Sequence, residues 1–482
     1  MRGYGLLATV GVLLLALSGC VFYLNPQCND QIRNGEETGI DCGGTCGRCN
    51  IGESCRVNDD CDDSNCTGGT CTAFACANAK QDDDETDVDC GGGTCRKCAG
   101  GRKCSIGADC FSGTCGADSR CSSLTEVSFA PAVAYPSGDK TYALFTGDLD
   151  GDGTLDLAAA NEQGSSISVF LNDGAGRFRR LDTPFPTGDY PTGGMLADFN
   201  HDGKLDVVTA DYHGDSVSVL LNQGNATGKL DPKSTYPTVD GAETSNLAVG
   251  DLDGDGNLDV VATNPQKASV SQFLGRRDGT FAPGVTSPVG ITGGSQPYSA
   301  AIGDFDRNGT NDMAIADLVN GPIIVRLGNG DGTFQPEVLY GAGGVGPNII
   351  ITTDIDLDGV LDLVTANRGA SSVSVLLGRG DGTFRKAIVS STGADTGPYS
   401  IAVTDFNLDG VPDVVTANFM ANNASVLLGV GDGHFAAAID AGPTGLFSYG
   451  TVAGDFDGDG KPDFATANAS DNNVTVKIST SH

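Results

Sequence analysis

The sequence of 482 residues has no tryptophan, four histidines and few basic residues: 28 Lys and Arg against 62 Asp and Glu, a formal net charge of −34. So acidic a surface repels a phosphate backbone, which argues against nucleic acid as a partner. The histidines are scattered and none repeats, so a histidine relay is not expected. Without tryptophan, sugar binding that depends on indole stacking is disfavoured.

Cysteine is absent after Cys121, although 17 cysteines occur up to that point, so the chain divides into two regions of different composition. Apart from Cys20, the cysteines form two sets of eight with matching spacing: Cys28, Cys42, Cys46, Cys49, Cys55, Cys61, Cys66 and Cys71, then Cys76, Cys90, Cys95, Cys98, Cys104, Cys110, Cys115 and Cys121. The segments EETGIDCGGTCGRC and DETDVDCGGGTCRKC indicate a duplication, with copies over 28–71 and 76–121. Each copy has few large apolar residues, so disulfides are expected to stabilise a small domain. Zinc at the two C-x-x-C pairs, 46–49 and 95–98, is the alternative.

The N-terminus is predicted to be a lipoprotein signal peptide over residues 1–19. A basic residue precedes an apolar segment, 6–17, that is too short to span a membrane comfortably. The tetrad LSGC, which ends at Cys20, resembles the lipobox of bacterial lipoproteins, and 20–27 would be the lipidated end and a short linker. Val21 stands where an Asp tends to retain lipoproteins at the inner membrane, so the outer membrane or cell surface of a bacterial envelope is expected. An ordinary signal peptide with a chance cysteine is the alternative.

From Asp148 onward, one nine-residue phrase recurs seven times, as in DLDGDGTLD, at intervals of 50 to 53 residues. The phrases begin at Asp148, Asp198, Asp251, Asp304, Asp354, Asp405 and Asp455. Such an interval suits a four-stranded propeller blade, and no segment of helical period interrupts the series. The sequence therefore predicts an all-β, seven-bladed β-propeller over 126–482, preceded by the small disulfide-rich duplicated domain.

Each repeat is expected to contain four strands. An apolar strand precedes the phrase, and a β-branched one such as LDVVTAD follows it. The third strand, as in SVSVLLN, alternates in a way that predicts one buried and one wetter face. The fourth is expected to begin at the aromatic residue after a Gly-rich hairpin: Phe178, Phe281, Phe334, Phe384 and Phe435. The last repeat has no room for its fourth strand, so the similar segment 127–133 is predicted to supply it and close the ring.

The recurring phrase D-x-[DN]-x-[DN]-G-x-x-D predicts a calcium loop. Positions 1, 3, 5 and 9 supply side-chain oxygens, position 7 supplies a backbone carbonyl, and glycine at position 6 permits the turn. The predicted ligands are Asp148, Asp150, Asp152, Thr154 and Asp156; Asp198, Asn200, Asp202, Lys204 and Asp206; Asp251, Asp253, Asp255, Asn257 and Asp259; Asp304, Asp306, Asn308, Thr310 and Asp312; Asp354, Asp356, Asp358, Val360 and Asp362; Asp405, Asn407, Asp409, Val411 and Asp413; and Asp455, Asp457, Asp459, Lys461 and Asp463. Up to seven calcium ions are expected, because all-oxygen ligation disfavours zinc and copper. The loops that begin at Asp198, Asp304 and Asp405 have one Asn in place of Asp and should bind most weakly. Turns without metal are the alternative.

The acidic phrase, the strand ending in TAN or AAN and the GDGTF hairpin resemble the FG-GAP/VCBS repeats of integrin α-type propellers over about residues 126–482. The resemblance implies structural calcium near one face, and binding of protein or carbohydrate at the opposite face or at blade edges. This chain departs from integrin α chains because every repeat has the loop. The Cys-rich copies look like a module of myxobacterial surface proteins, which implies a spacer without chemistry.

These features predict a calcium-binding, lipid-anchored cell-surface adhesion protein, a monomer that contacts the membrane only through its anchor and binds an extracellular protein or carbohydrate. The alternative is an exported polysaccharide-active enzyme, a lyase or hydrolase, and a structural role in the envelope is a third possibility. No catalytic residue is predicted. The best candidates for a ligand surface are tyrosines that mostly precede the first strand of a repeat: Tyr135, Tyr142, Tyr190, Tyr236, Tyr298, Tyr399 and Tyr449. Packing within the repeats is the alternative role for these side chains.

Overall fold

The structure, a computed structural model, describes residues 64–67, 70–73, 103–110, 115–116, 119–121, 126–224, 227–290, 294–319 and 321–481. The chain divides into two units, residues 1–98 with 103–109 and residues 99–102 with 110–482. Within the described residues, no helix has the length and hydrophobicity to cross a bilayer.

Part of the cysteine-rich region falls within the described residues. Strands β1 (Ser64–Thr67) and β2 (Thr70–Ala73) pair antiparallel, and η3 (Gly107–Asp109) is a short 3-10 helix. Cys110 forms a disulfide with Cys121, and Cys104 and Cys115 are also disulfide-bonded, which confirms the expectation of disulfides in the second copy. The predicted signal peptide, Cys20, the linker and both candidate zinc pairs lie outside the described residues.

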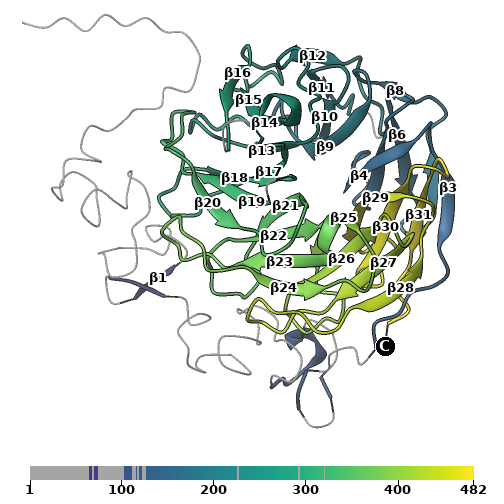
Figure 1. The fold of residues 1–482 in the computed structure, drawn as a ribbon. Coiled ribbons are helices and arrows are strands. Elements are labelled where there is room, and N and C mark those ends of the chain that lie inside the picture. The colour runs from purple at the N-terminus through teal and green to yellow at the C-terminus, as the bar shows by residue number, and fades with distance from the viewer. Residues whose placement is uncertain are drawn as a thin grey trace, which may run out of the picture. The chain divides into compact units, whose positions relative to one another are not determined.

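The second unit contains the predicted seven-bladed β-propeller. Seven antiparallel sheets surround a central axis, with the first strand of each blade innermost (Figure 1). In blade order the strands are β4 (Thr141–Gly147), β5 (Asp156–Asn161), β6 (Ser166–Asn172) and β7 (Phe178–Arg180), with β8 (Phe185–Pro186) also on β6; β9 (Pro191–Ala197), β10 (Asp206–Asp211), β11 (Ser216–Leu220) and β12 (Ser234–Pro237); β13 (Leu247–Gly250), β14 (Asp259–Asn264), β15 (Ser269–Phe273) and β16 (Val285–Pro288); β17 (Pro297–Gly303), β18 (Asp312–Asp317), β19 (Pro322–Arg326) and β20 (Val338–Gly341); β21 (Pro347–Thr353), β22 (Asp362–Asn367), β23 (Ser372–Leu376) and β24 (Ile388–Ser391); β25 (Pro398–Thr404), β26 (Asp413–Asn418), β27 (Asn423–Leu427) and β28 (Ile439–Pro443); and β29 (Ser448–Gly454), β30 (Asp463–Asn468), β31 (Asn473–Lys477) and β3 (Val133–Pro136). Short 3-10 turns, η4 (Pro265–Lys267) and η5 (Arg368–Ala370), follow the second strands of blades three and five.

Burial explains why the inner strands are rich in small and β-branched residues. Every residue of the second strand is buried in all seven blades. The prediction that the third strand has a wetter face is wrong, because β6, β11 and β23 are buried along their whole length. Neighbouring blades cover both faces of each sheet, as in the cluster that joins Val208 and Val217 of blade two to Val260 and Phe273 of blade three. Alternating serines therefore lie in the blade interfaces instead of in water.

The N-terminal strand closes the ring as predicted. β3 pairs antiparallel with β31, with Val133 opposite Val476, and Phe129 forms a bridge with Ser479. The Phe129 ring packs edge-on against Phe464 at 4.8 Å between ring centroids. The last blade therefore combines strands from both ends of the propeller sequence, and none of its strands needs a partner from outside the ring.

The fourth strand begins later than predicted in four blades. Phe281, Phe334, Phe384 and Phe435 make isolated bridges to the end of the third strand, and the ladder begins four residues further on. Only in blade one does the strand begin at the aromatic residue, Phe178. The aromatic ring packs between blades, as Phe384 does against Phe305 of the preceding blade, with 5.4 Å between ring centroids. It therefore belongs to the blade interface more than to the outer strand.

Candidate functional site

The seven acidic loops lie at one end of the propeller. Each joins the first strand of a blade to the second, as residues 148–156 join β4 to β5. The hairpins between third and fourth strands lie at the same end, because neighbouring strands are antiparallel. The fold therefore collects all predicted metal loops on one face.

The loops share one hydrogen-bonded framework. In every loop the position-1 Asp accepts a hydrogen bond from the position-6 glycine N–H, at 2.7 to 2.9 Å. In every loop the position-5 side chain accepts the position-7 N–H, at 2.7 to 3.0 Å. The position-6 glycines have φ between 80° and 89°, a left-handed conformation that disfavours any residue with a Cβ. The carboxylates therefore converge through the backbone of the loop itself.

Position 9 has a second role that pattern matching to a metal loop does not reveal. In every blade this Asp is fully buried, and one oxygen accepts the position-2 N–H while the other accepts an N–H at the end of the third strand. Asp362, for example, accepts from Ile355 at 2.9 Å and from Gly378 at 2.7 Å. The same carboxylate therefore holds the loop to its own sheet, with lone pairs left for a cation.

Crowding and burial raise the pKa of these carboxyl groups. Burial is the largest cause at position 9, where it raises the pKa to about 6 in five blades, to about 7 at Asp463 and to about 8 at Asp413. At position 3, burial and then the neighbouring carboxylates raise the pKa of Asp150, Asp253, Asp356 and Asp457. Such groups are stabilised as anions by a nearby positive charge.

The donor set fits a hard divalent cation. Side-chain oxygens of Asp354, Asp356 and Asp362 lie within 4.8 Å of one another, and those of Asp304, Asp306 and Asp312 do the same. The position-1, position-3 and position-5 oxygens cluster equally in the first and third loops. Calcium accepts six to eight oxygen ligands at 2.3–2.6 Å, so carboxylates this close suit it.

The loops differ in the charge that lies beside their carboxylates. Each Asn that replaces Asp turns its amide toward a neighbouring carboxylate: Asn200 to Asp202, Asn308 to Asp306 and Asn407 to Asp409. These internal bonds would have to be exchanged for metal contacts, and the weaker binding of the three loops stays a prediction.

In two loops a lysine at position 7 places a positive charge beside a loop carboxylate, which a count of acidic residues does not show. Lys204 Nζ lies 3.5 Å from Asp202, and Lys461 Nζ lies 3.1 Å from Asp459. The ammonium competes with a cation for the same carboxylate.

Three of the loops also contact the next blade through a backbone hydrogen bond. The position-2 carbonyl accepts a hydrogen bond from the following hairpin, as in Gly332 N–H to Leu252 O at 3.1 Å and Gly382 N–H to Phe305 O at 3.0 Å. Gly176 of blade one donates in the same way to Phe456 of blade seven, across the closure of the ring. The conformation of one loop is therefore coupled to the packing of its neighbour.

The seven predicted tyrosines form a pair, a cluster of four and one separate residue. Tyr135 and Tyr236 lie in fourth strands and pack against Phe178 and Phe281, which is the packing alternative. Four others, which we call the axial tyrosine cluster, converge on the propeller axis at the end opposite the acidic loops: Tyr142, Tyr298, Tyr399 and Tyr449. Tyr190 packs against His213, with 4.4 Å between ring centroids.

The phenol groups of the axial cluster contact one another. Tyr142, Tyr298 and Tyr399 are mutually hydrogen-bonded through their hydroxyls, and Tyr449 stacks on Tyr142 at 4.2 Å between ring centroids. Burial is the largest cause that raises the pKa of Tyr142 and of Tyr399 well above the ordinary value. The hydroxyls of Tyr142 and Tyr399 therefore remain protonated and act as hydrogen-bonding groups.

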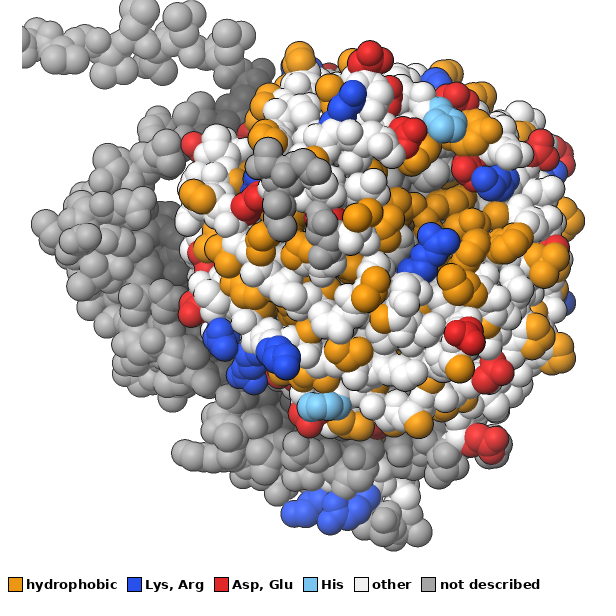
Figure 2. All heavy atoms as spheres, viewed as in Figure 1, with side chains coloured by type: hydrophobic (Ala, Val, Ile, Leu, Met, Phe, Trp, Pro, Cys, Tyr) orange, Lys and Arg blue, Asp and Glu red, His pale blue; other side chains and the backbone are white. Residues whose placement is uncertain are grey.

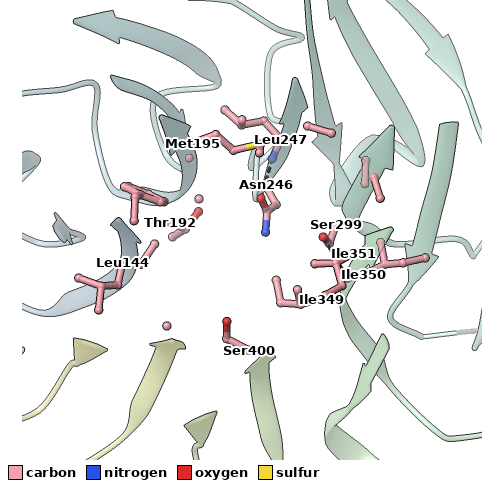
Figure 3. Close-up of a pocket in the computed structure, with 18 of the residues that line it drawn as sticks. Leu144, Thr192, Met195, Asn246, Leu247, Ser299, Ile349, Ile350, Ile351 and Ser400 are labelled. Atoms are coloured by element: carbon pink, nitrogen blue, oxygen red, sulfur yellow. Dashed lines mark hydrogen bonds between the residues drawn. The ribbon is translucent and has the colours of Figure 1, made fainter. Parts of the chain in front are cut away.

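A cavity of about 370 Å³ lies along the axis, with Tyr142, Tyr399 and Tyr449 in its wall. The innermost strands line it, largely with apolar side chains such as Leu247 and Ile350. Figure 3 shows the polar ends of Asn246, Ser299 and Ser400 pointing toward the middle of this space. Figure 2 shows one face of the molecule, on which hydrophobic side chains gather near the centre of the ring and acidic side chains lie mostly toward its edge.

Comparison with known proteins identifies the repeat. The model of the FG-GAP-like repeat family matches residues 148–209, 198–262, 251–315, 354–416 and 405–466. No curated protein matches the chain.

Among solved structures, an Agrocybe aegerita lectin that recognises non-reducing terminal N-acetylglucosamine is 22% identical, with 68% of this chain and 86% of the lectin covered and a TM-score of 0.47. Virginiamycin B lyase from Staphylococcus aureus is 12% identical, with 73% and 99% covered and a TM-score of 0.49. BBS1N, solved in complex with ARL6DN, is 12% identical, with 73% and 96% covered and a TM-score of 0.49. Likenesses this distant carry no argument about what this chain binds.

Proposed function

The chain belongs to the FG-GAP-like repeat family, and from this premise we propose that it is a calcium-stabilised binding module, anchored to a bacterial envelope through lipidated Cys20. The Cys-rich copies would separate the propeller from the membrane. An extracellular protein or carbohydrate would be the ligand, and the outer membrane or cell surface the location.

The observation that carries the proposal is the repetition of one loop geometry in all seven blades. A turn alone needs a glycine and one Asp, whereas each loop brings together carboxylates whose pKa is raised by burial and by one another. Burying several like charges is costly unless a cation neutralises them. Seven divalent ions would offset much of the formal charge of −34.

Calcium in this arrangement would have a structural effect. The loops that begin at Asp251, Asp304 and Asp455 contact the next blade through the position-2 carbonyl, so an ion bound there would stiffen the blade interface as well as its own loop. The opposite face would then be presented on a rigid ring. A binding surface that is already rigid loses less conformational entropy when the ligand binds, so more of the binding energy is kept.

An exported polysaccharide-active enzyme is the second candidate, because titratable groups gather at the axis. Tyr212 donates a hydrogen bond to Glu243 there, and burial is the largest cause that raises the pKa of Tyr212. A phenol with a raised pKa is a poor general base at neutral pH. Incubation with acidic and neutral polysaccharides, followed by detection of new reducing ends or unsaturated products, would support this candidate if products appear.

Calcium titration of chelator-treated protein by calorimetry tests the binding module directly. We expect several sites, up to seven, with the weakest in loops two, four and six. Thermal melts with and without chelator should differ by many degrees, because the ions bind only the folded loops. Absence of binding heat together with a melting temperature that ignores chelation would refute the role of calcium.

A further inference from the structure

The seven blades differ in a ring of residues around the mouth of the channel, opposite the acidic loops. The residue directly after the second strand of each blade is, in order, Glu162, Tyr212, Pro265, Leu318, Arg368, Phe419 and Ala469. We call these seven residues the mouth ring. The strand ends that precede them are nearly identical between blades, so the mouth ring is where the repeats are not equivalent.

The mouth ring has two charged residues, Glu162 and Arg368, and within the described part of the chain only Arg368 lacks a partner of opposite charge. Glu162 forms an ion pair with Lys140 at 2.7 Å, and the nearby Glu243 accepts the Tyr212 hydroxyl. No carboxylate of the described residues lies within ion-pair distance of Arg368. Its guanidinium instead lies over two aromatic rings, 4.8 Å from the Phe419 centroid and 5.3 Å from the Tyr399 centroid.

Stacking leaves the edge of a guanidinium available for a planar anion. Arg is always charged at physiological pH, and its N–H groups match a carboxylate in a two-bond fork. Contact with aromatic faces fixes the side chain, so less rotamer entropy is lost when an anion binds. Arg368 is half-buried, which places this fork at the surface of the mouth.

An aromatic platform lies next to this cation. Phe419 and Phe447 stack at 4.9 Å between ring centroids with an interplanar angle of 27°, and Phe447 is 44% exposed. Tyr449 contacts Phe419 at 4.9 Å between ring centroids and links the platform to the axial tyrosine cluster. The mouth therefore combines flat apolar rings, phenol hydroxyls and one cation without a counter-charge.

We propose that Arg368 and the Phe419–Phe447 platform bind an acidic sugar residue of the uronic acid type. The carboxylate pairs with the Arg368 fork, the C–H face of the pyranose packs on the phenyl rings, and sugar hydroxyls hydrogen-bond to phenols of the axial cluster. The inference rests on the proposed function and names the class of ligand. Phenylalanine and tyrosine rings here supply the stacking surface for which tryptophan is absent from the sequence.

An acidic peptide fits the same mouth less well. Extended peptides add to a free strand edge, but the inner strands of all seven sheets face the channel, beneath the tyrosines. The overall negative charge opposes any acidic ligand at long range. The acidic loops lie at the other end of the propeller, however, and interactions of exposed charges fade beyond about 8 Å at physiological salt.

The test is calorimetric titration of the full chain in fixed free calcium with oligomers of galacturonate, glucuronate and mannuronate. A methyl-esterified galacturonate oligomer, a neutral galactose oligomer and an oligoglutamate peptide are the comparison probes. We expect at least one uronate oligomer to bind and the esterified and neutral probes to bind at least tenfold more weakly. Arg368→Gln should weaken uronate binding by about tenfold to hundredfold, the usual effect of losing a charged hydrogen-bonded partner.

Two further variants test whether uronate binding depends on the aromatic platform and on Arg368 in particular. Phe447→Ala removes a ring that is 44% exposed and should weaken uronate binding, whereas the lost stacking on Phe419 should lower the melting temperature only slightly. Arg177→Gln is the matched control, because Arg177 is a strongly exposed arginine in a hairpin at the acidic-loop end, and it should leave binding unchanged.

Three outcomes would overturn the proposal: no uronate oligomer binds, binding survives Arg368→Gln because the calcium loops hold the ligand, or only the oligoglutamate peptide binds in an Arg368-dependent way. Calcium titration and chelator melts need no sugar, so failure of the proposed function would be seen separately.

Discussion

The position-9 carboxylate offers the sharpest test of how the loops work, and Asp362→Asn is the variant of choice. Asn has the same shape as Asp, but only one of its two terminal atoms accepts hydrogen bonds. Asp362 is fully buried and accepts N–H groups from Ile355 and Gly378 with its two oxygens. The amide must therefore leave one buried N–H without an acceptor, which costs about 1–3 kcal/mol.

The variant should behave differently with and without calcium. In calcium the loss of a ligand adds to the lost hydrogen bond, and we expect a total of about 3 kcal/mol. In chelator the loss should be smaller, because the substitution also removes a buried negative charge whose pKa is raised to about 6. Asp381→Asn, at an exposed hairpin Asp of the same blade, is the control and should stay within about 0.5 kcal/mol of the parent protein.

Denaturant unfolding of both variants, with and without chelator, measures these differences, since the midpoint and slope together give the free energy of unfolding. An equal loss for Asp362→Asn in calcium and in chelator would mean that the carboxylate is a structural acceptor and no metal ligand. No loss in either condition would refute both roles.

Three other predictions concern pH, one loop and the ring closure. Burial raises the pKa of Asp362 to about 6 and of Asp413 to about 8, whereas an Asp in the unfolded chain has a pKa of about 3.9. In metal-free protein the protonation of these groups therefore stabilises the fold fully below pH 4, and this stabilisation is lost as the pH rises through 6 and 8. Chelation should lower the melting temperature more at pH 7.5 than at pH 5, and an equal effect at the two pH values would contradict this. Lys461→Thr removes the ammonium group that lies 3.1 Å from Asp459, so it should tighten calcium binding at the seventh loop. Calorimetry would detect the gain in affinity, and no gain would mean that the lysine points away from the carboxylate in solution. Deletion of residues 1–136 removes β3 and should expose β31, giving aggregation or a broadened melt by light scattering and calorimetry, whereas deletion of residues 1–125 should give neither.

Much of the fold follows from local sequence. The nine-residue phrase specifies a tight turn through its glycine and short acidic side chains, and the β-branched segments on either side specify strands. The number of phrases therefore predicts the number of blades. The closure of the ring can also be predicted from the sequence, because the segment around Phe129 repeats the pattern of the segment around Phe281. Local chemistry is enough in these cases because the hydrogen bonds inside each loop join residues fewer than ten positions apart, and the bond that ties the loop to the third strand of its own blade spans only 16 positions.

The contacts between blades were beyond the reach of the sequence pattern. The alternating third strand was expected to face water on one side, and only the neighbouring blade shows that both faces are covered. The outer strand begins four residues late, because Phe384 packs against Phe305, 79 positions earlier in the chain, before the outer ladder forms.

The candidate ligand site depends wholly on the ring. Its members, among them Tyr142, Arg368 and Phe447, come from different blades and meet only because the closed ring brings those blades to one axis. The repeating part of the sequence thus specifies the blades and the acidic loops through short-range bonding, whereas the arrangement at the channel mouth exists only once long-range packing has closed the ring.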